Sequence, residues 1–170
     1  MDLADVKSLL AGLNGDIYLV GGIIRNYLLG EKFEDVDLVV RNSPQLIAQQ
    51  FANKVNGSFV ELDASRDMYR VVTPNLNYDF SLLVGDSIEE DLQRRDFTIN
   101  AMALEINNDS FKDKQLIDPY QGLNDLKQGI IKVVTDKSLA ADPLRILRCV
   151  RFKAQFEFAI DRYTYDLAAK

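Results

Sequence analysis

Apolar residues at the start of the chain follow first a helical and then a strand-like spacing. Leucine and valine side chains over residues 2–11 recur at the spacing of one helix face, which predicts a short amphipathic helix. Asn14-Gly15 interrupts this pattern, and the continuous apolar run over 17–20 then predicts a buried strand. The chain therefore opens with a helix that leads into a strand.

The same patterns predict a mixture of helices and strands for the rest of the chain. Further helices are predicted at 23–29, from Ser43-Pro44 onward, and at 88–93, 98–103, 123–127, 143–156 and from Asp161 onward. Further strands are predicted at 35–40, 58–62, 69–73, 76–83, 104–106 and 130–134. Ser43 is expected to cap its helix, with Pro44 in the first turn. We expect an α+β chain, with a mixed-sheet domain over 1–140 and a helical segment over 141–170.

The two ends of the chain carry different signals. The last predicted helix reaches Lys170 without Gly, Pro or any capping signal, so we expect the chain to be part of a longer protein. The acidic start at Met1-Asp2 is unlike the basic start of a secretory signal or transit peptide. No apolar run approaches the roughly 18 residues that would span a bilayer. A cytoplasmic protein without a membrane segment is therefore expected.

Composition narrows the chemistry that the chain can perform. Its 170 residues include one cysteine and no histidine. An internal disulfide, a Cys/His zinc site and a Ser-His-Asp or Cys-His catalytic unit are thereby excluded. Catalysis would rest on carboxylates, arginine or lysine, backbone amides and metal ions. The single cysteine, Cys149, lies within a predicted helix and is most simply a small core residue.

Charge is unevenly distributed along the chain. The chain holds 20 basic and 26 acidic residues, for a net charge of −6, which argues against general electrostatic binding of nucleic acid. Residues 141–170, however, hold six basic and four acidic residues, so a local basic site is expected there. Four charged residues recur at every third position of the predicted helix and share one ridge: Asp142, Arg145, Arg148 and Arg151. A solvated basic face is the alternative interpretation.

A parallel ridge on the same predicted helix is apolar. It consists of Leu144, Leu147 and Val150. Because apolar ridges are usually buried, we expect these three side chains to pack against the preceding domain.

Two short motifs near the start of the chain suggest a phosphate and metal site. Asp35 and Asp37 begin a predicted strand, where side chains two residues apart share a face, so their carboxylates form a natural ligand pair for Mg²⁺. Gly21-Gly22, between a strand and a helix, lets backbone amides approach a phosphate, and Arg25 adds charge one turn later. Taken singly, each motif is more typical of an ordinary turn, and the glycines match neither the dinucleotide fingerprint nor the P-loop. Together they outline an anion cradle that faces a metal site.

Four segments resemble, in order, the motifs of class II tRNA nucleotidyltransferases and bacterial poly(A) polymerases. The segments are Leu19–Gly30 with Asp35–Asp37, Arg94–Ala103, Asp118–Leu126 and Asp142–Phe152. The resemblance implies a polymerase-β-type catalytic head over 1–140 and the beginning of an all-α neck over 141–170. The parts of the family that hold the tRNA, namely the remaining neck, body and tail, have no counterpart in these residues.

The resemblance also implies a set of catalytic residues. Asp35 and Asp37 would hold two Mg²⁺ ions, which activate the RNA 3′-hydroxyl and neutralise the triphosphate as pyrophosphate leaves. Asp79, on the predicted strand over 76–83, falls where such folds place a third acidic residue. An edge-strand surface charge is the alternative interpretation of Asp79.

Further positions match residues that contact the nucleotide in the family. Those that match in the first two motifs are Gly21, Gly22, Arg25, Arg95, Asp96 and Asn100. Asp96 or Thr98 is expected to cap a short helix, and Asn100 to orient the site through its amide. Asp142 and Arg145 match the base-reading pair of the fourth motif, on the same ridge as Arg148 and Arg151. An acceptor beside a donor fits the Watson–Crick edge of adenine and cytosine, which predicts use of ATP and CTP and rejection of GTP and UTP.

The resemblance predicts template-independent addition of C or A to the 3′ end of tRNA. Three departures from the family pattern bear on this: Asn26 and Ala141 replace a usual Asp and Glu, and the stretch from Asp79 to Asp91 is short. A short stretch resembles relatives that add only the two C residues. The alternatives are a poly(A) polymerase, a non-catalytic RNA-binding relative, and a nucleotidyltransferase that acts on small molecules.

Overall fold

The computed structural model describes residues 2–106 and 116–169, in which one sheet of seven strands runs in the order β3-β4-β5-β2-β1-β6-β7. Its strands are β1 Ile17–Val20, β2 Asp35–Val40, β3 Ser58–Asp63, β4 Met68–Val72, β5 Asn77–Leu82, β6 Ala103–Glu105 and β7 Leu116–Ile117. β2 and β5 are parallel, whereas the other neighbours in this sheet are antiparallel. A separate parallel pair joins β8 Ile130–Ile131 to β9 Ala159–Ile160.

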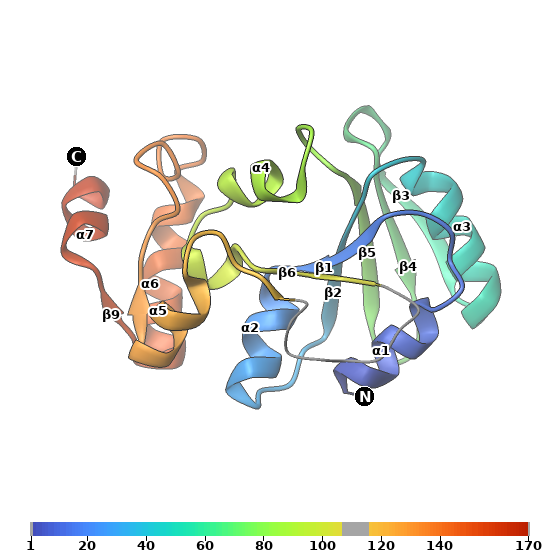
Figure 1. Ribbon diagram of the computed structural model, residues 1–170, viewed down its shortest axis with the longest axis horizontal. Coiled ribbons are helices and arrows are strands. Elements are labelled where there is room, and N and C mark those ends of the chain that lie inside the picture. Colours follow the sequence, from blue (N-terminus) through green and yellow to red (C-terminus); the bar gives the residue numbers. More distant parts are fainter. Residues whose placement is uncertain (1, 107–115, 170) are drawn as a thin grey trace.

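Seven α-helices and two short 3₁₀ turns surround the sheet in the described residues. They are α1 Leu3–Leu10, α2 Gly22–Leu29, α3 Pro44–Val55, η1 Ala64–Arg66, α4 Ile88–Gln93, η2 Thr98–Asn100, α5 Gly122–Gln128, α6 Leu144–Phe156 and α7 Arg162–Ala168. Helices α5, α6 and α7 gather at one end of the molecule, opposite α1 and α3 (Figure 1). No helix in the described part of the chain is long and apolar enough to cross a membrane. The mixed sheet with flanking helices confirms the predicted α+β class.

Alternation along β2 places the carboxylates of Asp35 and Asp37 on one face of the sheet. Val36 and Leu38 are fully buried, and on the opposite face Asp35 is exposed and Asp37 half-buried. Helix α3 covers the apolar face, where Phe51 packs edge-on against Tyr78 with ring centroids 4.6 Å apart. Burial of one face by α3 thus leaves the carboxylate face open for a site.

Helix α6 packs against the head with a different face from the one expected. Leu144, Leu147 and Val150 are 64%, 66% and 59% exposed, so the prediction that this ridge is buried is wrong. Cys149 and Phe152 are buried instead, and Phe152 meets Phe97 with ring centroids 5.8 Å apart. A large aromatic ring gains more from burial than the leucines do, which explains the rotation of the helix. The expected core position of Cys149 is confirmed.

Most predicted elements are present, but several differ in extent. The helix predicted over 98–103 is only the single turn η2, because Ala103 already pairs with Val20 of β1. The strand predicted over 130–134 is limited to β8, although Val133 bridges to Phe97. Turn η1 and strands β7 and β9 were not predicted.

The expected cap at the start of α3 is also absent. Ser43 adopts a left-handed conformation with a φ of 52° and its side chain makes no capping hydrogen bond. Pro44 does occupy the first turn, as predicted.

Candidate nucleotide-binding site

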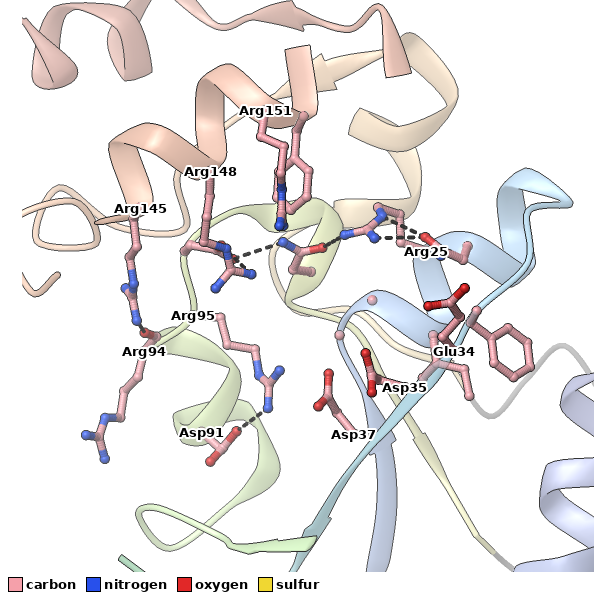
Figure 2. Close-up of a pocket in the computed structure, with 18 of the residues that line it drawn as sticks. Arg25, Glu34, Asp35, Asp37, Asp91, Arg94, Arg95, Arg145, Arg148 and Arg151 are labelled. Atoms are coloured by element: carbon pink, nitrogen blue, oxygen red, sulfur yellow. Dashed lines mark hydrogen bonds and ion pairs between the residues drawn. The ribbon is translucent and has the colours of Figure 1, made fainter. Parts of the chain in front are cut away.

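A cavity of about 550 Å³ opens between the carboxylate face of β2 and the arginine ridge of α6. Six arginines and five acidic residues are among its lining side chains. The three arginines of α6, Arg145, Arg148 and Arg151, project toward the cavity from one side (Figure 2). Asp35 and Asp37 lie across the cavity on β2. The structure thus brings together two of the predicted motifs that are more than 100 residues apart in sequence.

The two carboxylates of β2 carry negative charge that the protein compensates only partly. Burial raises the pKa of Asp37, and the nearby charges of Asp79 and Asp35 raise it further, against the opposing effect of Arg95. Asp35 Oδ1 accepts a hydrogen bond from Asn77 Nδ2 at 3.1 Å. Within the described residues, no group of three or more His, Cys, Asp or Glu side chains could hold a metal ion. A cation here would therefore depend on these two carboxylates and on oxygens from a substrate.

The predicted third carboxylate, Asp79, lies next to Asp37 but is already paired. It is the register partner of Asp37 on the parallel strand β5. Arg70 of β4 donates to both of its oxygens, Nε to Oδ1 and Nη2 to Oδ2, each at 2.6 Å. Asp79 does not line the cavity. Its catalytic role stays a prediction.

Gly21 shapes the floor of the cavity. Its φ of 74° and ψ of −131° are conformations that glycine adopts readily and other residues rarely do. A Cβ atom built there would lie 3.0 Å from Nη1 of Arg95 and 3.6 Å from Oδ2 of Asp37. Gly22 then begins α2, whose first turn presents backbone amides to the cavity. The backbone thus closely approaches charged groups at this turn, and the anion cradle stays a prediction.

Arg25 is buried at the junction of α2, η2 and α6. Its guanidinium donates to Oδ1 of Asn26, at 3.1 Å from Nε and 2.8 Å from Nη2, and also to Oδ1 of Asn100. The same guanidinium lies over the rings of Phe152 and Phe156, at 4.8 and 4.9 Å from their centroids. Burial lowers the pKa of Arg25 to about 10, so the side chain is still a cation at neutral pH. Arg25 therefore holds α6 against the head while it lines the cavity.

A polar chain continues from Arg25 across the back of the cavity. Asn100 Nδ2 donates to Oδ1 of Asp96 at 3.1 Å, which agrees with the expectation that its amide orients neighbouring groups. Neither Asp96 nor Thr98 caps η2 as predicted, since Phe97 occupies the cap position and Thr98 Oγ1 donates to Asp125. Arg148 Nη2 lies 3.0 Å from Asp96 Oδ2.

Arg95 Nε is a buried polar atom that donates no hydrogen bond within the described residues. Arg95 lines the cavity, and unsatisfied buried groups of this kind are rare unless a ligand or water completes them.

Asp91 is a site residue that the sequence analysis missed. Its side chain is buried, accepts from Arg95 Nη2 at 3.2 Å through Oδ2, and lines the cavity. The four-residue spacing of Asp91 in α4 and Arg95 just beyond its end is the signal that could have identified the pair. Asp91 directs Arg95 toward Asp37, as Figure 2 shows.

The predicted base-reading pair is engaged elsewhere. Asp142 Oδ1 accepts from the backbone amide of Leu144 at 2.9 Å, so it caps the start of α6, and Asp142 does not line the cavity. Arg145 lines the cavity but donates to the backbone oxygens of Ser138 and Arg94, at 2.9 and 2.8 Å. The base-reading role of the two residues stays a prediction.

A family model described as the poly(A) polymerase head domain matches residues 17–132. The chain belongs to this family. The match contains β1, α2 and β2, and therefore the Gly21-Gly22 turn and both carboxylates of the site.

The chain is also similar to curated relatives and to solved structures. It is 42% identical to a CC-adding tRNA nucleotidyltransferase of Synechocystis sp., across 89% of this chain and 36% of that protein. It is 38% identical to a CC-adding tRNA nucleotidyltransferase of Geobacter sulfurreducens, across 96% of this chain and 38% of that protein. A structure of a CCA-adding enzyme in complex with ATP superposes with a TM-score of 0.86 at 34% identity, covering 98% of this chain and 41% of that one. The chain thus spans about two fifths of the length of these relatives.

Proposed function

We propose that this chain is the catalytic head, with the first neck helices, of an enzyme that adds C or A from CTP or ATP to the 3′ end of tRNA and releases pyrophosphate. In this proposal residues 1–140 form the head and residues 141–170 the beginning of the neck. The observation that carries it is the cavity in which Asp35 and Asp37 face an arginine wall across a glycine turn. Negative metal ligands beside cationic side chains suit a triphosphate and its metal ions.

Different residues of the chain would bind different parts of the substrate. Backbone amides at Gly22 and the guanidinium of Arg25 would hold the triphosphate. Arg95, aimed by Asp91, would neutralise charge beside Asp37 as pyrophosphate forms. Arg95 Nε would gain the hydrogen-bond partner that it lacks in the protein alone.

Mg²⁺ fits Asp35 and Asp37. The ion commonly binds through one or two carboxylates and completes its shell with water and substrate phosphates, and this site offers two carboxylates and raises the pKa of Asp37. Bound there, it would acidify the RNA 3′-hydroxyl and neutralise the leaving pyrophosphate.

Addition of C alone is the finer form of this proposal. The short connection between Asp79 and Asp91 supports it. Relatives of the chain include both CC-adding and A-adding tRNA nucleotidyltransferases, so their names do not decide between C and A. Those names also support a tRNA acceptor over synthesis of poly(A). Products made from CTP alone, ATP alone or both, on a tRNA that lacks its 3′-terminal CCA, would show which residues are added.

The test of the main proposal is incorporation of labelled CTP into that tRNA by Asp35→Asn and Asp37→Asn variants. We expect both substitutions to abolish incorporation, because each removes the charge of a proposed metal ligand. We expect both variants to have the same unfolding temperature as the parent protein, because the fold keeps its packing. Asp166→Asn is the matched control, since Asp166 is exposed on α7 and pairs only with Arg162 at the surface. Near-parental turnover by either site variant in the presence of Mg²⁺ would refute the proposal.

A further inference from the structure

A second cleft, of about 820 Å³, adjoins the nucleotide cavity. It is bounded by Arg66 of η1, Arg94 at the end of α4, the segment from Thr135 to Ala141, and Arg145 of α6. Arg94 and Arg145 line both this cleft and the nucleotide cavity, so the two are continuous. The sequence motifs did not predict this second cleft.

The cleft is strongly cationic in a chain that is acidic as a whole. Arg66, Arg94, Lys137 and Arg145 line it, against the single carboxylate of Asp136. Arg66 is also paired at the surface with Asp63, at 3.5 Å from Nε to Oδ2. Within the described residues, the side chains of Arg94 and Lys137 have no carboxylate partner. Arg145 donates to backbone oxygens, which carry no net charge and so do not neutralise it. Such uncompensated charge attracts phosphate, and unlike the nucleotide cavity the cleft has no acidic pair to hold a metal.

The position of the cleft matches the direction from which an acceptor must arrive. In nucleotidyl transfer the attacking oxygen and the leaving pyrophosphate lie roughly in line on opposite sides of the reacting phosphorus. Arg94 and Arg145 lie on the side of the nucleotide cavity away from Arg25 and Glu34 (Figure 2). With the triphosphate held near Arg25, an acceptor entering through the second cleft would pass Arg94 and Arg145.

We propose that this cleft binds the backbone phosphates of the RNA strand whose 3′ end is extended. The inference rests on the proposed function and adds to it the path of the acceptor strand. Arg66 and Lys137 stand at this cleft but not at the nucleotide cavity, so they contact RNA phosphate and not the incoming nucleotide. Thr135 and Ser138, whose hydroxyl oxygens lie 3.2 Å apart, supply hydrogen-bonding groups beside the strand.

The test compares binding of a labelled single-stranded RNA dodecamer with binding of CTP and Mg²⁺ to the same protein. Substitutions Arg66→Ala and Lys137→Ala remove one proposed phosphate contact each. Each is expected to weaken RNA binding about fivefold at 0.1 M salt and to lower the slope of log affinity against log salt by about 0.7, as release of counterions from single strands predicts. CTP affinity is expected to stay at the parental value.

Two further variants sharpen the test. Lys127→Ala removes an exposed lysine of α5 that lines neither cavity, and it should leave RNA binding and its salt slope unchanged. Asp136→Asn removes the only carboxylate of the cleft and should tighten RNA binding.

Three outcomes would overturn the inference. They are parental RNA affinity in both Arg66→Ala and Lys137→Ala, an equal loss in Lys127→Ala, and a loss of CTP or pyrophosphate affinity in place of RNA affinity. Each of these leaves the proposed function standing if the parent incorporates CTP. Failure of the parent to incorporate CTP while RNA binding still depends on Arg66 and Lys137 would refute the proposed function alone.

Discussion

Arg70 and Asp79 face each other across strands β4 and β5 and form a two-point ion pair, with both nitrogen–oxygen distances at 2.6 Å. The pair lies directly beside Asp37, because Asp79 is the register partner of Asp37 on the neighbouring strand. Arg70 thus neutralises the charge of Asp79, whereas Asp35 and Asp37 line the open cavity.

Substitutions of Arg70 and Asp79 separate a role of Asp79 in stability from a role in catalysis. Arg70→Met leaves a half-buried carboxylate unpaired and should cost about 1–3 kcal/mol of unfolding free energy. The double variant Arg70→Met/Asp79→Asn should recover part of this loss, as measured by denaturant unfolding in a double-mutant cycle. If Asp79 is the third catalytic carboxylate, Asp79→Asn will lower CTP incorporation far more than Arg70→Met does. Equal losses in the two single variants would assign Asp79 to the fold alone.

Gly21→Ala should impair nucleotide binding beyond its effect on stability. The new Cβ would stand 3.0 Å from Arg95 Nη1, so Arg95 or the turn must move. Gly12→Ala is the matched control, because Gly12 also has a positive φ, of 81°, but has no atom within 4 Å of the added Cβ. Both variants should lose about 1–3 kcal/mol to backbone strain, but only Gly21→Ala should weaken CTP binding in a calorimetric titration. Similar CTP affinities in the two variants would argue against a cradle at this turn.

Asp142→Ala should lower the use of ATP and CTP and narrow their advantage over UTP and GTP. Two mismatched hydrogen-bond pairs on the wrong base correspond to discrimination on the order of hundredfold, measured as the ratio of kcat/KM values. Because Asp142 also caps α6, loss of the cap must be separated from loss of base reading. Asp142→Ser supplies that control, since a serine hydroxyl can cap the helix but is too short to reach a base. Unchanged rejection of UTP and GTP in Asp142→Ala would refute the base-reading role.

Helix α6 should tolerate change on its exposed ridge and not on its buried face. Phe152→Ala removes a fully buried ring that contacts Phe97 and Arg25, and it should cost about 3–5 kcal/mol. Leu147→Ala, at a side chain that is 66% exposed, should change the unfolding free energy by no more than about 0.5 kcal/mol. Thermal unfolding of the two variants checks the orientation of the helix. A larger loss for Leu147→Ala would restore the orientation that the apolar ridge predicted.

Local patterns predicted the elements that carry the site. The alternation around Asp35 and Asp37 gave the correct face of β2, and the glycine pair marked the turn into α2. These features depend on backbone preferences within a few residues, which a single sequence reveals.

The face with which α6 packs could not be predicted in this way. The helix has apolar side chains on opposite sides, and the choice depends on Phe97 and Arg25, which come from distant segments. The two-residue strands β7 and β9 form only because a partner strand is present, and the pairing of Arg70 with Asp79 depends on sheet register. Such contacts are set by tertiary structure and leave little trace in local periodicity.

The strand order also has a consequence for the time at which the surroundings of Asp35 and Asp37 are assembled during folding. β1 and β2 are adjacent in the chain and pair with each other, but the outer edge of β2 is completed only by β5, after α3, β3 and β4 have been synthesised. The other edge of β1 is completed later still, when β6 has been synthesised. Closing loops of this length slows folding, and until then both edges are open to wrong partners. A nascent chain therefore completes the sheet around Asp35 and Asp37 only when the central strands become internal.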